Sequence, residues 1–108
     1  MAVKRIWHGW TTHDNADTYQ SLLHDVVFPG IEAKNIHGYR KIELLRRAHA
    51  EEVEFITIMT FESLQNVIDF QGQDYEKAYV PDAARQVLRR WDDTSAHYEV
   101  VETRDYGT

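Results

Sequence analysis

The sequence predicts an α+β protein with the element order β-α-β-β-α-β, and three observations support this fold class. A chain of 108 residues with 43% hydrophobic residues has the size and composition of one globular domain, so we expect a single domain over residues 1–108. Four segments are rich in β-branched and aromatic residues, as strands are. Two segments between them repeat apolar residues at helical spacing.

The first strand is expected over residues 3–12, and a helix follows it. Asp14 and Asn15 precede this helix and are residue types that cap helix N-termini. The helix has one apolar face, formed by Tyr19, Leu22, Leu23, Val26 and Val27. We expect the pair Pro29-Gly30 to break or kink this helix, because proline lacks the backbone N–H that a helix needs.

The second and third strands are expected at residues 39–47 and 52–61, with a polar hairpin loop at residues 48–51. Both strands are bounded by residues that favour turns, and the loop carries charged side chains. We therefore expect an antiparallel hairpin in the middle of the chain.

The remaining elements are helical, except for a last strand. Ser63 can cap a helix whose apolar positions are Leu64, Val67, Ile68 and Phe70. A short helical piece is expected at residues 74–79. Pro81 suits the first turn of a final helix. Residues 95–103 then form the last strand.

The apolar pattern of the strands predicts their order in the sheet. Residues 55–61 are nearly apolar on both faces, and the first strand carries Ile6, Trp7 and Trp10 on both faces. Strands that are buried on both faces lose the alternation of apolar and polar residues, so these two are central. The second and fourth strands alternate and are edges. The resulting order, 4-1-3-2, is that of a four-stranded antiparallel ferredoxin-like sheet.

This architecture predicts a homodimer. Helices can cover only one face of such a sheet, and the other face then exposes more apolar surface than a soluble monomer usually carries. A second copy that packs sheet to sheet is the simplest cover.

Composition excludes several classes of function. The absence of cysteine excludes disulfides, thiolate metal sites and cysteine nucleophiles, and it suits a cytoplasmic protein. The net charge of −6 argues against nucleic acid as a partner. No apolar run approaches the roughly 20 residues of a membrane span, so no membrane partner is expected. The histidine spacing fits no metal motif, so we expect no metal.

Four strings carry a resemblance to a known family: Ile6-Trp7-His8-Gly9, Val53 to Ser63, Asp74-Tyr75-Glu76-Lys77-Ala78 and His97-Tyr98-Glu99-Val100. With the element order, they resemble the antibiotic biosynthesis monooxygenase family, which has the dimeric α/β-barrel fold. Known branches of that family oxidise aromatic polyketides or quinols with molecular oxygen, without metal or flavin, and another branch degrades haem.

The resemblance implies a cofactor-independent monooxygenase-like protein that acts on a small aromatic or quinol-type substrate. The alternative is a non-catalytic dimeric domain of the same fold that binds a small apolar or aromatic ligand. Fold alone does not decide between them.

Several positions depart from the family pattern. Where the polyketide branch has Trp, Asn and Tyr, this chain has Phe61, Thr57 and Val67. At the axial histidine of the haem-degrading branch it has Val80. Without an axial ligand haem is not expected, so the expected cofactor set is empty.

Substrate-binding candidates are aromatic residues on the central strands and in the layer above them: Trp7, Phe61, Phe70, Tyr75 and Tyr79. All five could equally be ordinary core residues. Gly9 could leave space for a ligand beside Trp7, or it could mark a bulge or a close backbone approach.

The candidate catalytic bases are His97 and His8, which are both expected on strands. An imidazole, with a solution pKa near ~6.5, can accept a proton at neutral pH. The alternative for each is a structural or exposed histidine.

Overall fold

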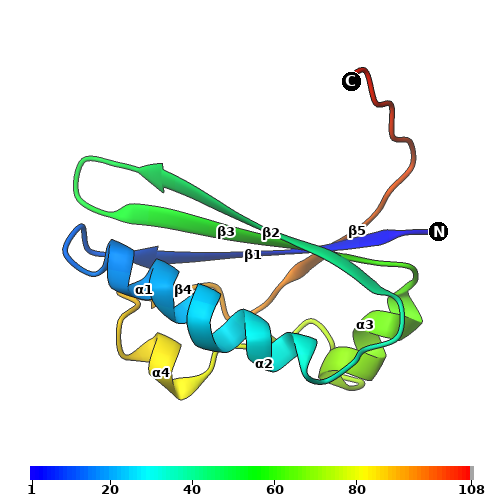
Figure 1. Ribbon diagram of the computed structural model, residues 1–108, viewed down its shortest axis with the longest axis horizontal. Helices are drawn as coiled ribbons and strands as arrows, with labels where there is room; N and C mark the ends of the chain where they lie inside the picture. The colour runs from blue at the N-terminus through cyan, green and yellow to red at the C-terminus, as the bar shows by residue number, and fades with distance from the viewer. Residues whose placement is uncertain (108) are drawn as a thin grey trace.

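One antiparallel sheet is covered on a single face by helices in the computed structural model (Figure 1). The structure describes residues 1–107; Thr108, the last residue of the expected domain, lies outside the described residues. The strands are β1 (Val3–Thr11), β2 (Tyr39–Ala48), β3 (Val53–Phe61), β4 (Arg90–Trp91) and β5 (Ala96–Glu99). The helices are α1 (Ala16–Leu22), η1 (Leu23–Val27, a π-helical turn), α2 (Phe28–Glu32), α3 (Leu64–Gln71) and α4 (Asp82–Arg85).

The sheet confirms the predicted α+β fold and strand order, with β1 and β3 at the centre. The order is β2-β3-β1-β4, and β5 pairs with the other end of β1. All nine residues of β1 pair with β3. Both central strands are therefore hydrogen-bonded on two sides, as their apolar pattern requires.

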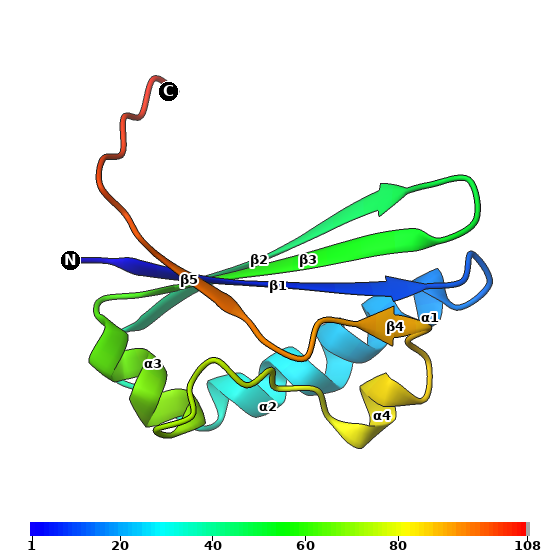
Figure 2. The same ribbon diagram turned by 180° about the vertical axis from the view of Figure 1, so that it is seen from behind.

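The last strand, β5, is shorter than predicted, and a separate short strand, β4, precedes it (Figure 2). Between β4 and β5, the backbone turns from β1 toward the segment after α3. The N–H of Ser95 donates to Glu76 O at 2.7 Å, and the N–H of Ala78 donates to Asp93 O at 2.9 Å. The strand ends at Glu99 rather than residue 103, because β1 begins at Val3 and offers no partner beyond the bond from Val100 N–H to Ala2 O.

The first helix is not broken at Pro29. Helical backbone continues from Ala16 to Glu32, but residues 23–27 widen into a π turn in which the N–H of Phe28 donates to Leu23 O. Pro29 has no backbone N–H. In a regular α-helix the carbonyl of Asp25, four residues earlier, would therefore lack its hydrogen-bond donor. The wider turn therefore lies where the α-helical bonding would be lost.

The second half of the chain contains less helix than predicted. The hydroxyl of Ser63 caps α3 as expected, since it accepts from the N–H of Asn66 at 3.4 Å. The helical piece expected at residues 74–79 is wrong: residues 72–81 form turns and irregular structure, which we call the 72–81 segment. Apart from one turn, in which the N–H of Lys77 donates to Asp74 O, its backbone bonds to residues 93 and 95. Within residues 1–107, no helix has the length and apolar character needed to cross a membrane.

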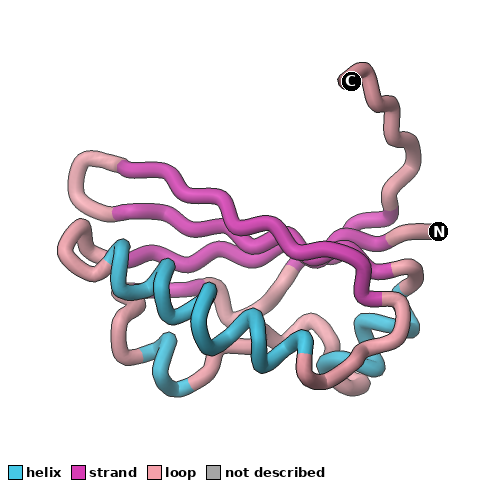
Figure 3. Tube along the Cα trace, in the orientation of Figure 1, coloured by secondary structure: helices cyan, strands magenta, loops and turns pink. Residues whose placement is uncertain are grey.

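The two faces of the sheet differ in burial. Along β1, buried residues alternate with half-buried ones, and the buried set faces the helices. The core between sheet and helices includes Tyr19, Phe55, Phe61 and Val67, all at most 1% exposed. No helix within residues 1–107 covers the opposite face (Figure 3), which we call the open face. At its centre lie Ile6, Leu45, Ile56 and Ile58.

We predict opposite effects of alanine at two glycines. Gly38 has φ +79°, and a Cβ there would lie 2.3 Å from Oδ1 of the buried Asn66. Gly38→Ala should therefore lower the free energy of unfolding by about 1–3 kcal/mol. Gly30, in α2, has open space around it, so Gly30→Ala should raise that free energy by about 0.5–1 kcal/mol. Urea denaturation measures both; equal effects would contradict the turn geometry.

Candidate functional site

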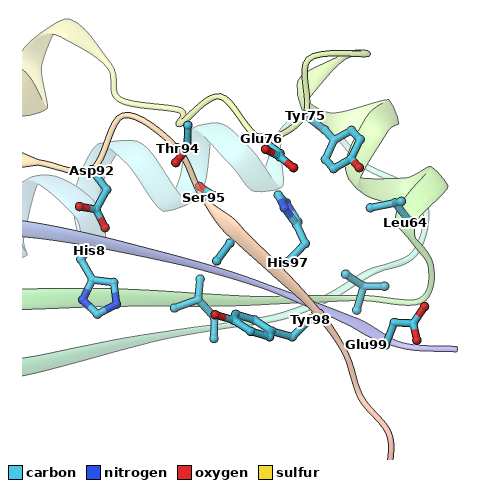
Figure 4. A pocket seen from close by; sticks show the side chains of 13 residues that line it. His8, Leu64, Tyr75, Glu76, Asp92, Thr94, Ser95, His97, Tyr98 and Glu99 are labelled. Carbon is cyan, nitrogen blue, oxygen red and sulfur yellow. The ribbon is translucent and has the colours of Figure 1, made fainter.

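Two hollows lie close to the predicted site residues. The first, which we call the cavity, lies between the sheet and the helix layer and has a volume of about 50 Å³. Its lining includes Arg5, Trp7, Tyr19, Thr57, Phe70 and Tyr79. The second, which we call the groove, is an open depression of about 800 Å³ along β5 (Figure 4). Its lining includes His8, Tyr75, Glu76, His97 and Tyr98, and Ser95 lines both hollows.

Arg5 is the one charged side chain of β1 that faces the helix layer, and it is only 3% exposed. Its Nη1 donates to Tyr75 O at 2.5 Å and lies 3.0 Å from Nε2 of His97. Nη2 donates to Lys77 O at 2.9 Å. The guanidinium thereby joins the centre of the sheet to the 72–81 segment and to β5.

The Arg5 charge is held by neutral groups. Two backbone carbonyls and an imidazole are its hydrogen-bond partners, and the ring of Phe70 lies 5.6 Å away. No carboxylate within residues 1–107 forms an ion pair with it. Burial lowers the pKa of the Arg5 guanidinium to about 10, so the group stays charged at neutral pH. The cavity wall therefore carries an uncompensated positive charge.

His97, on β5, lies beside Arg5 and lines the groove (Figure 4). Its ring meets that of Tyr75 edge to face, with centroids 5.2 Å apart. Burial, and secondly the Arg5 charge, lower the pKa of His97 to about 4. The imidazole is therefore neutral at pH 5–8. Because Nη1 of Arg5 can only donate, we assign Nε2 as the acceptor and place the ring proton on Nδ1.

His8 lies on the other side of the sheet from His97, on the open face (Figure 4). Its Nδ1 is 3.0 Å from Oε2 of Glu54, and Nε2 of His49 is 2.9 Å from Oε1 of the same carboxylate. These two hydrogen bonds, that of His49 first, lower the pKa of Glu54. In the part of the chain that the structure describes, no three His, Asp or Glu side chains are grouped to hold a metal ion.

The structure brings three of the predicted substrate-binding residues together and separates the others. Trp7, Phe70 and Tyr79 line the cavity, and Nε1 of Trp7 donates to Asp92 O at 2.7 Å. Tyr75 lines the groove instead. Phe61 is fully buried and packs between Tyr39 and Phe70, with centroids 5.4 and 6.0 Å away, so it supports the site from the core.

Gly9 makes room for Trp7. A Cβ at Gly9 would lie 2.5 Å from Cη2 of the Trp7 indole and 3.1 Å from Cδ2 of Leu88. The space above this glycine is thus filled by the tryptophan that forms a wall of the cavity, and the close backbone approach is the role that the contacts give it.

Sequence reasoning missed Arg5, Tyr19 and Thr57, which also line the cavity. The available signal was strand parity: Arg5 lies two residues before Trp7 and must share its face. An arginine on the face of a central strand that points at the core is rare unless it is paired. That combination marks Arg5 as a functional candidate.

Known structures share this fold. A candidate antibiotic biosynthesis monooxygenase from Bacillus cereus matches with a TM-score of 0.66 and 12% identity, over 96% of this chain and 97% of that one. A candidate member from Nitrosomonas europaea matches with a TM-score of 0.65 and 8% identity, over 93% and 90%. A variant of SnoaB, a cofactor-independent oxygenase from Streptomyces nogalater, matches with a TM-score of 0.61 and 15% identity, over 94% and 95%.

These matches extend over nearly the full length of each chain at low sequence identity. No protein-family model matches the chain, and no curated protein sequence matches it. Similarity at this level establishes the fold, because backbone geometry persists long after side chains have diverged, whereas function depends on the site. The chain therefore has the fold of the antibiotic biosynthesis monooxygenase structures.

Proposed function

We propose that the protein is a cofactor-independent monooxygenase whose substrate is a small aromatic or quinol-type molecule bound in the cavity. The observation that carries this proposal is the uncompensated charge of Arg5 in a wall that also contains Trp7 and Phe70. The fold shared with SnoaB, a cofactor-independent oxygenase, supports it.

Such chemistry needs an electron-rich phenolate or enolate that can transfer an electron to oxygen. A buried positive charge favours the ionised form of a nearby hydroxyl and so lowers its pKa. Arg5 supplies that charge, and the aromatic walls exclude water. The proton passes to Nε2 of neutral His97, which must first give up the hydrogen bond that it accepts from Nη1 of Arg5. Once the oxyanion forms, its charge offsets that of Arg5, which removes one cause of the low pKa of His97.

The cavity must widen to admit a substrate. A volume of about 50 Å³ is far below the roughly 300 Å³ at which ligand pockets usually begin. Of the walls, the 72–81 segment lacks helix and strand and includes Tyr79, which is 39% exposed. We propose that this segment moves away from the sheet when the substrate enters from the groove.

The alternative function, a binding domain without catalysis, has one observation in its favour. His97 has a pKa of about 4, and its Nε2 is already bonded to Arg5, so it is a weak base before a ligand arrives. In that case the cavity binds the same class of aromatic ligand and no oxygen is consumed.

We also propose that the protein is a homodimer that pairs through its open face. Ile6, Ile56 and Ile58 lie there without cover from a helix (Figure 1). Tyr98 on the edge is 58% exposed, and the residues after β5 extend away from the helix layer on the same side. A partner sheet would cover this apolar surface.

Replacement of His97 tests the catalytic proposal. His97→Ala should lower oxygen consumption with hydroquinone or phenol substrates by roughly 10²-fold, the usual size of a general-base contribution. Because the wild-type imidazole is neutral above its pKa of about 4, turnover limited by His97 should be level from pH 6 to 8 and fall as the pH approaches 4. An oxygen electrode measures both.

The matched control is His24→Ala, since His24 is exposed on η1 and its side chain bonds to the neighbouring Asp25. Its turnover should equal that of the wild type. Wild-type turnover in His97→Ala would reject His97 as the base. If the wild type consumes no oxygen but aromatic ligands raise its melting temperature, the binding domain is the correct function.

Ile58→Lys tests the dimer. Ile58 lies at the centre of the open face, so the lysine would place a charge in the proposed interface. Sedimentation should show the mass falling from about twice 12.7 kDa to 12.7 kDa, with circular dichroism unchanged. Val26→Lys is the control, because Val26 is 57% exposed on the helix layer. A wild-type monomer, or an Ile58→Lys dimer, would contradict this pairing.

A further inference from the structure

Arg5 has hydrogen-bonding capacity that the protein leaves unused. A guanidinium has five N–H groups. Nη1 uses two of them, on Tyr75 O and His97, and Nη2 uses one, on Lys77 O. No hydrogen bond within residues 1–107 uses the Nε–H or the second Nη2–H. These two donors remain on a side chain that is 3% exposed and lines the cavity.

The charge is also unpaired, which is costly. A buried ion loses its hydration, and proteins normally offset that loss with an opposite charge. Among residues 1–107, the partners of the Arg5 guanidinium are carbonyl dipoles, an imidazole and the face of Phe70. Those contacts hold the guanidinium in place but leave its net charge uncancelled. An anion that entered the cavity would therefore gain a fixed partner.

We propose that the cavity ligand carries a carboxylate, which binds the free Nε–H and Nη2–H of Arg5, and an aromatic ring, which lies against Trp7 and Phe70. This inference rests on the proposed function in one respect, namely that the cavity is the ligand site. It adds the chemical class of the ligand, a small aromatic acid, and in such a ligand the free donors of Arg5 bind the carboxylate rather than the hydroxyl.

A carboxylate fits these donors better than other anions do. Its two oxygens match two N–H groups of one guanidinium, and such forked pairs are the strong form of charge-assisted hydrogen bond. A phosphate carries more negative charge than the single positive charge of Arg5 can cancel. A second positive charge lies near the cavity, because Nζ of Lys34 is 4.4 Å from the ring centroid of Tyr79 and 5.2 Å from that of Phe70. From that position, the positive charge of Lys34 can attract an anion toward the cavity.

The test compares an acid with a neutral molecule of the same shape. We would titrate the protein with 4-hydroxybenzoate and with 4-hydroxybenzyl alcohol at pH 7 by calorimetry. The wild type should bind the acid roughly tenfold to a hundredfold more tightly, as expected for hydrogen bonds to a charged group. Equal affinities, or a preference for the alcohol, would overturn the carboxylate site.

Variants assign the preference to Arg5. Arg5→Gln should abolish it, whereas Arg104→Gln, in the exposed C-terminal segment, should retain it. Arg5→Lys keeps the positive charge but lacks the two parallel N–H groups of the guanidinium, so it should bind the acid with intermediate affinity. If Arg5→Gln does not fold, the lysine variant decides: undiminished preference there would contradict a forked pair. A preference that persists in a folded Arg5→Gln protein would place the carboxylate elsewhere.

Failure of this inference is distinguishable from failure of the proposed function. If the acid binds with the stated preference but no oxygen is consumed, the carboxylate site stands and the monooxygenase proposal fails. Should neutral quinols be oxidised while the acid has no advantage, the monooxygenase proposal stands and the carboxylate site fails.

Discussion

The hydrogen bonds of Arg5 are the interaction on which the site depends. From the centre of β1, the guanidinium bonds to the carbonyls of Tyr75 and Lys77 and to Nε2 of His97. The 72–81 segment has no helix or strand of its own, so these bonds, with those to residues 93 and 95, fix its path over the sheet. The same contacts place His97 and Tyr75 in the groove and Tyr79 on the cavity wall.

The electrostatics of the site follow from the same side chain. Burial of Arg5 without a carboxylate gives the cavity a positive wall, and that charge together with burial keeps His97 neutral. An arginine, a neutral imidazole and two aromatic rings form a small set of groups that can bind and polarise an acidic aromatic molecule. Stability alone would favour an apolar residue at this position, because a buried charge with no counter-ion costs free energy.

Much of the fold could be predicted from the sequence because it depends on periodicity. The nearly apolar run from Phe55 to Phe61 identified β3 as central, and Ser63 marked the start of α3. Local patterns could not predict that residues 74–79 are not helical, since their backbone bonds to residues 93 and 95, which are distant in sequence. Trp7 and Phe70, which were chosen for their aromatic character, line the cavity. Arg5 was missed, because a charged residue is normally exposed and its burial results from tertiary contacts.

A crystal structure of the protein with 4-hydroxybenzoate tests the central claim, that Arg5 is a preformed partner for an anionic ligand, most directly. Both carboxylate oxygens should lie within about 3 Å of Nε and Nη2 of Arg5. The ring should lie against Trp7 and Phe70, and the 72–81 segment should be displaced from the sheet to make room. A ligand that lies in the groove with its carboxylate in solvent, and with the contacts of Arg5 unchanged, would contradict the account.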